Sequence, residues 1–282
     1  MHKLLLAIDI GNTNIVAGLF DKEKLMTEWR MATDIGKTTD EYAAGIQSFL
    51  ALKHISEKAI HNAIISSVVP PLSTTFKEAI KQCFDISPQI VEPEKIKNLK
   101  MKVDNPKEVG ADRLVNAVAT YTLYGGPCII IDFGTATTFC AVSKKGEYLG
   151  GAITAGPKIT RDTLYQRTAK LPKVELAWPE KLIGVNTVEA IQSGLLYGYS
   201  EMVEGMVRRF KKILGENTKV IATGGLVTLF QKEVRCFDEV NPSLTLLGLQ
   251  VIHAGKLTRI RRGLNGIHVA RSVDQTQRHG KD

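Results

Sequence analysis

Residues 4–20, LLLAIDIGNTNIVAGLF, give the first indication of how this chain folds. An apolar run reaches Asp9, passes through Gly11, Asn12 and Thr13, and turns at once into a second apolar run. Two short apolar runs separated by small polar residues are typical of strands joined by a tight turn. The stretch therefore predicts a hairpin with a carboxylate and a glycine at its turn.

The same pattern returns in residues 128–151, CIIIDFGTATTFCAVSKKGEYLGG. Asp132 follows Asp9, and Gly134 follows Gly11, at the same interval of 123 residues. One such hairpin is a weak signal. Two copies, each opening one half of the chain, indicate a duplicated fold.

Strands and helices follow each other in the remainder of both halves. Apolar spacing and turn residues predict strands at 63–69, 89–91 and 219–225, a Gly-rich turn and a helix within 150–172, and longer helices at 40–53, 72–84, 111–123, 187–214 and 244–254. This order predicts an α/β fold of two mixed sheets, flanked by helices, that face each other across a cleft. We expect a first domain at 1–115, a second at 116–255 and a tail at 256–282.

The composition is that of an ordinary globular protein, with 44% hydrophobic and 23% charged residues. Asp9 interrupts the first apolar stretch, and no run approaches the roughly 18–20 apolar residues of a membrane span. We therefore expect neither a signal peptide nor a membrane segment. The four cysteines show no paired metal-ligand spacing, which favours reduced, structural thiols in a cytoplasmic protein.

The formal net charge of +8 is unevenly distributed. Residues 256–282 hold seven Lys and Arg against two Asp and so supply +5 of it. The rest of the chain is close to neutral and has no basic stripe interleaved with aromatic residues. This distribution argues against a nucleic-acid partner and favours a solvated tail.

Both Asp-Gly turns suit a phosphate group. Glycine lets the backbone approach a ligand closely, and the N–H groups and hydroxyls of such a turn converge on one point. The aspartates repel phosphate, but they can hold a cation, or water around Mg²⁺, that bridges to it. A hairpin stabilised by its own Asp and Asn explains one copy equally well, whereas two copies facing a cleft favour phosphate binding. Gly224, in the TGG of 223–225, is a weaker candidate for a nucleotide contact.

The segment 105–117, NPKEVGADRLVNA, places Gly110, Asp112 and Arg113 at a predicted helix start. A non-catalytic explanation is equally good for both charged residues. Asp112 can be an acid of the first helical turn that the helix dipole stabilises, and Arg113 can be the partner of a surface carboxylate. In the catalytic interpretation, Asp112 accepts a proton from a hydroxyl while Arg113 holds an anionic substrate group. Phosphoryl transfer requires little more than a carboxylate, backbone amides and metal ions.

Together these motifs resemble those of type III pantothenate kinases. DIGNTN, NPKEVGADR, IDFGTATTF, GEYLGGAITAG, AKLP, IGVNT and ATGGL occur in the order of that family, over residues 4 to about 254. The family belongs to the actin/Hsp70/sugar-kinase superfamily, whose fold is a duplicated ribonuclease-H-like domain. The resemblance implies ATP-dependent phosphorylation of pantothenate to 4′-phosphopantothenate, the first step of coenzyme A biosynthesis.

The resemblance also implies roles for single residues. Asp112 would be the general base for the pantothenate hydroxyl, and Asp132 would bind a monovalent cation, K⁺ or NH₄⁺. Asp9 would hold Mg²⁺ through water, and Thr187 would reach pantothenate across a homodimer interface. The implied ATP contacts are Asp9, Ile10, Gly11, Asn12, Thr13, Asn14, Ile15, Val16, Thr135 and Gly224. The implied substrate contacts are Val103, Gly110, Ala111, Asp112, Arg113 and Thr187.

The chain departs from the family pattern at two positions. Val103 stands where many members have an aromatic residue, and Ala155 where many have proline. Two other functions stay open: a sugar or polyphosphate kinase or phosphatase of the same superfamily, and a non-catalytic regulator that binds nucleic acid through the tail. The GADR segment argues against the first. The presence of Asp9, Asp112 and Asp132 argues against the second.

Overall fold

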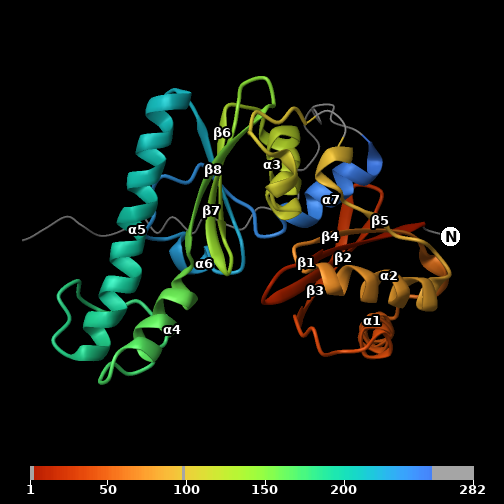
Figure 1. The fold of residues 1–282 in the computed structure, drawn as a ribbon, viewed down its shortest axis with the longest axis horizontal. Coiled ribbons are helices and arrows are strands. Elements are labelled where there is room, and N and C mark those ends of the chain that lie inside the picture. Colours follow the sequence, from red (N-terminus) through yellow and green to blue (C-terminus); the bar gives the residue numbers. More distant parts are fainter. Residues whose placement is uncertain (1–2, 97–98, 256–282) are drawn as a thin grey trace, which may run out of the picture.

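Two five-stranded sheets form the framework of the protein (Figure 1). The computed structural model describes residues 3–96 and 99–255, so the predicted tail at 256–282 lies outside the described residues. The elements of the first half are β1 (Leu4–Ile10), β2 (Asn14–Asp21), β3 (Lys24–Ala32), α1 (Thr39–Leu52), β4 (Ile60–Ser67), α2 (Pro70–Phe84), β5 (Gln89–Ile90) and α3 (Ala111–Tyr124). Those of the second half are β6 (Cys128–Phe133), β7 (Ala136–Val142), β8 (Tyr148–Ala155), α4 (Pro157–Arg167), α5 (Thr187–Leu214), β9 (Lys219–Thr223), α6 (Val227–Phe230), β10 (Glu239–Val240) and α7 (Leu244–Ala254).

The two sheets have the same topology. Their strand orders are β3-β2-β1-β4-β5 and β8-β7-β6-β9-β10. In each sheet the first three strands in sequence are antiparallel, and the last two run parallel to the first. The prediction of a duplicated α/β fold with two mixed sheets is therefore confirmed.

Local sequence explains where several helices begin. Thr38 and Glu41 form a capping box in front of α1, with Glu41 N–H donating to the Thr38 hydroxyl and Thr38 N–H to the Glu41 carboxylate. Asn186 accepts from the N–H of Glu189 at the start of α5. Such caps satisfy N–H groups that have no partner inside the helix. The long helices predicted from apolar spacing are all present, with shifts of at most two residues at their ends.

The sequence did not predict β3, and the prediction of a Gly-rich turn near residues 150 and 151 was wrong. Both glycines lie inside β8, the edge strand of the second sheet. A Cβ on Gly151 would overlap the carbonyl group of Phe139 on β7. The glycine therefore permits an unusually close approach of two backbones, which is one of the roles of glycine within strands.

Three apolar cores hold the layers together. One lies between the first sheet and helices α1 and α2, and another between the second sheet and helices α5 and α6. The third lies between the two halves, where α3 and α7 pack against each other (Figure 1). The helix α7, although last in sequence, also packs against β1, β2 and β4 of the first sheet. The predicted domain boundary after residue 115 falls inside α3 and stays a prediction.

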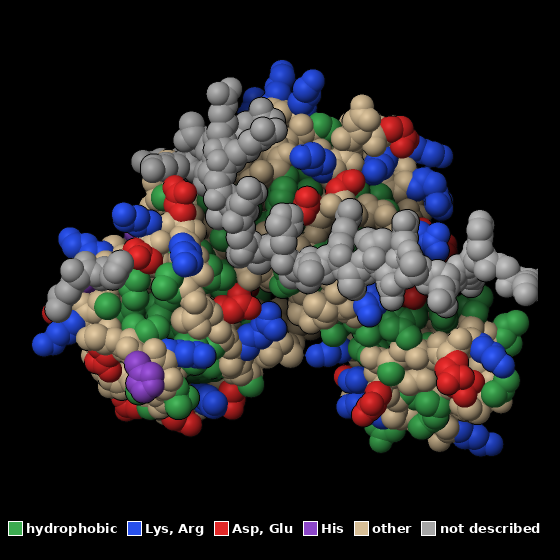
Figure 2. Space-filling model, turned by 180° about the vertical axis from the view of Figure 1, so that it is seen from behind, with side chains coloured by type: hydrophobic (Ala, Val, Ile, Leu, Met, Phe, Trp, Pro, Cys, Tyr) green, Lys and Arg blue, Asp and Glu red, His purple; other side chains and the backbone are tan. Residues whose placement is uncertain are grey.

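Within residues 3–96 and 99–255, no helix combines the length and the apolar character that crossing a membrane requires. All four cysteines have free thiols. Figure 2 shows the face opposite that of Figure 1, where a deep notch separates two lobes. Basic and acidic side chains are interspersed over both lobes of that face.

Candidate active site

The two Asp-Gly turns meet between the sheets. Asp9 and Asp132 are each the second-last residue of a central strand, β1 and β6 respectively. The hydroxyls of Thr13 and Thr135, in the turns that follow, share a hydrogen bond of 2.7 Å although they are 122 residues apart in sequence. The turns therefore face each other, as the sequence predicted.

The first turn is tight and is held from outside. The N–H of Gly11 donates to the carbonyl of Asn14 at 3.0 Å. Thr33, just after β3, donates its hydroxyl to the carbonyl of Gly11 at 2.7 Å and its N–H to the carbonyl of Thr13 at 3.0 Å. The side chains of Asn12, Thr13 and Asn14 are exposed, whereas those of Ile10 and Ile15 are fully buried. The side chains of the two isoleucines thus belong to the core and do not face a ligand.

The second turn packs against the segment that follows β8. The N–H of Gly156 donates to the carbonyl of Thr135 at 3.1 Å, and a Cβ on Gly156 would overlap that carbonyl. The carbonyl of Ala155 accepts from the hydroxyl of Tyr199 at 3.1 Å. The departure from the family pattern at Ala155 therefore coexists with a closed and well-supported turn.

Three carboxylates, Asp9, Asp112 and Asp132, lie close enough to repel one another. Burial, and next the charge of Asp112, raise the pKa of Asp9 to about 8 and that of Asp132 to about 7. Burial also raises the pKa of Asp112. Each side chain keeps part of its surface open to solvent. The site therefore concentrates negative charge that a bound cation would neutralise.

The donor set fits a cation shared with a phosphate ligand. In the part of the chain that the structure describes, no three His, Cys, Asp or Glu side chains are arranged to hold a metal ion by themselves. Mg²⁺ usually keeps several waters and binds through one or two carboxylates together with substrate phosphates. Asp9 and Asp132, at the ends of facing strands, can supply such carboxylates to a cation.

Asp112 is oriented by its immediate neighbours at the start of α3. Its Oδ1 accepts from the N–H of Arg113 at 2.8 Å. A Cβ on Gly110 would lie 2.5 Å from the same oxygen, so only glycine leaves room for this orientation. The first turn of a helix also favours a negative charge. Gly110 and Arg113 therefore act on Asp112 through backbone geometry, and Ala111 is buried between Gly110 and Asp112 in the chain.

The sequence interpretation missed the residues that orient Asp132. The amide Nδ2 of Asn116 donates to Asp132 Oδ2 at 2.9 Å, and the hydroxyl of Thr245 donates to Asn116 Oδ1 at 2.8 Å. Asn116 follows Asp112 by one helical turn, so i, i+4 spacing could have identified it. Gly224, at φ +97°, lies against Asp132, and a Cβ there would overlap Oδ1 of that carboxylate. Gly224 thus leaves room for Asp132.

The remaining predicted substrate residues lie in different places. Val103 is partly buried against the core between the halves, with its Cγ1 3.5 Å from the position of a Cβ on Gly150. Thr187 is exposed at the start of α5, which lies on the side of the second sheet away from α3 (Figure 1). Thr187 therefore does not join the site of its own chain.

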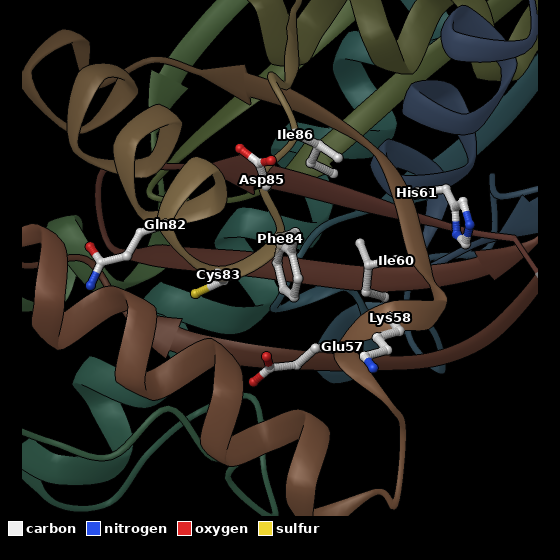
Figure 3. Close-up of a pocket in the computed structure, with 9 residues that line it drawn as sticks. All are labelled: Glu57, Lys58, Ile60, His61, Gln82, Cys83, Phe84, Asp85 and Ile86. Carbon is white, nitrogen blue, oxygen red and sulfur yellow. The ribbon is translucent and has the colours of Figure 1, made fainter.

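A separate hollow of about 470 Å³ lies at the other end of the first sheet (Figure 3). The start of β4, at Ile60 and His61, lines it together with the end of α2, at Cys83 and Phe84. Because β1 and β4 run parallel, this end is opposite the one that carries Asp9. The hollow is therefore distinct from the site at the turns.

Comparison with protein families and curated proteins agrees with these features. The family profile described as Type III pantothenate kinase matches residues 5–209. A protein of Moorella thermoacetica named Type III pantothenate kinase is 47% identical over 250 residues, which cover 89% of this chain and 98% of that protein. A protein of the same name from Halalkalibacterium halodurans is 45% identical over the same shares.

Similarity to solved structures extends the comparison at the level of fold. The activator of 2-hydroxyisocaproyl-CoA dehydratase from Clostridium difficile, solved with bound ADPNP, matches with a TM-score of 0.52 and 12% identity. The match covers 90% of this chain and 94% of that one. At this identity the match establishes a common fold of the actin-like ATPase kind.

Proposed function

The chain belongs to the type III pantothenate kinase family, and from this premise we propose that Asp112 is the general base in the transfer of a phosphoryl group from ATP to pantothenate. The product would be 4′-phosphopantothenate, the first intermediate of coenzyme A biosynthesis. One observation carries the proposal: the two Asp-Gly turns meet each other, and Asp112 at the start of α3 lies close to Asp9. Groups suited to phosphate thus lie beside a largely buried carboxylate.

Asp112 has the properties of a general base for a hydroxyl. The N–H of Arg113 occupies Oδ1, so Oδ2 is left for the substrate hydroxyl. Burial raises the pKa of Asp112, and a base whose pKa lies nearer the working pH removes a proton more effectively. Arg113, which follows directly, would hold the carboxylate of pantothenate.

The turns have the properties of a nucleotide phosphate site. In the turn formed by residues 10–16, the backbone and exposed side chains of Asn12 and Thr13, together with Thr135, would surround the ATP phosphates. Asp9 would hold Mg²⁺ through water, and Asp132 a monovalent cation. When bound, these cations neutralise phosphate charge and so favour phosphoryl transfer. Gly224 would lie beside the nucleotide while leaving room for Asp132.

The test is a phosphotransfer assay with ATP, Mg²⁺ and K⁺ that compares pantothenate with a panel of sugars. We expect turnover with pantothenate and with none of the sugars. In Asp112→Asn, turnover should fall roughly 10²-fold or more while ATP binding is retained. Glu108→Gln removes an exposed carboxylate from the same segment and serves as the control. Near-normal turnover of Asp112→Asn would overturn the general-base assignment, and turnover of a sugar would overturn the substrate.

We also propose a homodimer in which Thr187 of one chain completes the site of the other. Thr187 is exposed and lies among exposed apolar side chains, which favours a protein interface. These neighbours are Leu182 (62% exposed), Ile183 (82%), Val185 (82%) and Val188 (43%).

Mixing two inactive variants tests the shared site. If each site combines Asp112 of one chain with Thr187 of the other, a mixed dimer of Asp112→Asn and Thr187→Ala contains one intact site. Co-refolding equal amounts should then restore about a quarter of wild-type activity, because half of the dimers are mixed. The absence of restored activity in dimers of verified mixed composition would refute the shared site.

A further inference from the structure

The side chain of Arg113 is held by two residues from the other half of the chain. Its Nε donates to Cys140 Sγ at 3.3 Å. Its guanidinium carbon lies 5.9 Å from the centre of the Tyr148 ring, within the range of a cation–π contact. The Tyr148 hydroxyl and Cys140 Sγ are 3.5 Å apart, so all three side chains touch.

Cys140 and Tyr148 form a rigid support. Their exposed fractions are 1% and 0%, and they lie on the paired strands β7 and β8. The backbone of Tyr148 also binds the segment before Val103, because its N–H donates to the carbonyl of Lys100 and its carbonyl accepts from Lys102, both at 2.8 Å. Tyr148 thus supports Arg113 and the segment that carries Val103 at the same time.

This support leaves one edge of the guanidinium available. Nε is engaged, and the guanidinium carbon lies over the ring of Tyr148. Among the residues that the structure describes, neither terminal amino group of Arg113 has a hydrogen-bond or ion-pair partner. The protonated forms of Cys140 and Tyr148 carry no charge, so they orient the guanidinium without neutralising it. A planar guanidinium with both terminal amino groups available matches a carboxylate through two parallel hydrogen bonds.

We propose that Cys140 and Tyr148 are positioning residues that aim the two terminal amino groups of Arg113 at the carboxylate of the substrate. The inference rests on the proposed function and adds how the site selects a substrate that ends in a carboxylate. Cys140 sets the angle of the guanidinium through Nε, and the ring of Tyr148 holds the guanidinium carbon in position. The selectivity of the first half of the chain for its substrate therefore depends on two strands of the second half.

Two substrates separate this role from a general structural one. Pantothenyl alcohol has the same reacting hydroxyl as pantothenate but carries an alcohol in place of the carboxylate. We expect Cys140→Ala to raise the KM for pantothenate roughly tenfold, which corresponds to about 1.4 kcal/mol. The KM for ATP, and kcat/KM for pantothenyl alcohol, should change less than twofold. Cys140→Ser, which restores an acceptor for Nε, should recover most of the affinity for pantothenate.

Cys128→Ala is the matched control, because Cys128 is also fully buried in the same core but does not contact Arg113. If Cys140→Ala does not fold, Tyr148→Phe and Tyr148→Leu carry the test. The phenylalanine variant keeps the ring over Arg113 and should bind pantothenate more tightly than the leucine variant.

Two results would overturn the positioning role. The first is a failure of the variants to differ in KM for pantothenate, whether Cys140→Ala from Cys128→Ala or Tyr148→Phe from Tyr148→Leu. The second is an equal loss of kcat/KM for pantothenate and pantothenyl alcohol. Failure of the proposed function is distinguishable, because the wild-type protein would then phosphorylate neither compound.

Discussion

Replacement of Asp132 by asparagine should stabilise the protein while removing its activity. Asp132 is largely buried beside Asp9 and Asp112, and burial followed by the charge of Asp112 raises its pKa from 3.8 to about 7. Ionised Asp132 therefore destabilises the folded protein when no cation is bound. Asparagine has the same shape and can still accept the hydrogen bond from Asn116, but it carries no charge.

The size of the effect depends on pH. Each pKa unit corresponds to about 1.36 kcal/mol, so a rise from 3.8 to about 7 lowers the free energy of unfolding by about 4 kcal/mol at pH 8. At pH 5 folded Asp132 is protonated, and the cost falls to about 2 kcal/mol, which is the cost of protonating a carboxyl that ionises when unfolded. Because the side chain keeps part of its surface open to solvent, we expect about half of these values.

The direction follows from proton binding. Between pH 4 and pH 7 the folded protein holds a proton on Asp132 that the unfolded chain has released, so raising the pH favours the unfolded chain. Asp132→Asn removes this dependence. Its free energy of unfolding should exceed that of the wild-type protein by about 2 kcal/mol at pH 8 and by about 1 kcal/mol at pH 5. At pH 8 this gain corresponds to about 4–8 °C in Tm.

The assay is thermal unfolding at pH 5 and pH 8 in tetramethylammonium buffers with a chelator, so that no small cation neutralises the site. Adding K⁺ at pH 8 should then raise the Tm of the wild-type protein more than that of Asp132→Asn, because the asparagine lacks the negative charge that attracts the cation. Asp104→Asn makes the same chemical change at an exposed position and serves as the control. A Tm of Asp132→Asn at or below that of the wild-type protein at pH 8 would refute the reasoning. A gain that is equal at both pH values would refute it as well.

Two further predictions concern the contacts around the turns. Gly224→Ala should lower the free energy of unfolding by about 1–3 kcal/mol and reduce turnover, because its Cβ would displace Asp132. Gly225 has open space around it, so Gly225→Ala should change neither quantity much. Chemical denaturation and the kinase assay on both variants measure this difference, and equal effects would contradict it. Thr13→Val and Thr135→Val should show a coupling of about 1 kcal/mol in a double-mutant cycle of unfolding, since their hydroxyls share a hydrogen bond. Additive effects would mean that the two turns do not touch in solution.

Much of the fold could be predicted because its signals are local. Apolar spacing located the long helices, and the repeated Asp-x-Gly hairpin indicated that the two halves share a topology. The strand β8 was missed because its glycines resemble a turn in sequence. Only the approach of Gly151 to the backbone of Phe139 explains why glycine is needed inside that strand. Whether residues 148–155 form a strand therefore depends on their pairing with β7, which the local pattern of residues does not show.

The candidate site divides in the same way. The sequence by itself indicated Asp9, Asp112 and Asp132 as candidate residues for the chemistry, because they stand in motifs whose residue types and order can be read along the chain. Only the tertiary structure decided how those groups behave. The raised pKa of each carboxyl comes from burial by elements remote in sequence, and the orientation of Arg113 comes from two strands of the other half. Motifs show which residue types stand at each position. The pKa of the carboxyls and the orientation of the Arg113 side chain depend on which surfaces meet when the two halves pack.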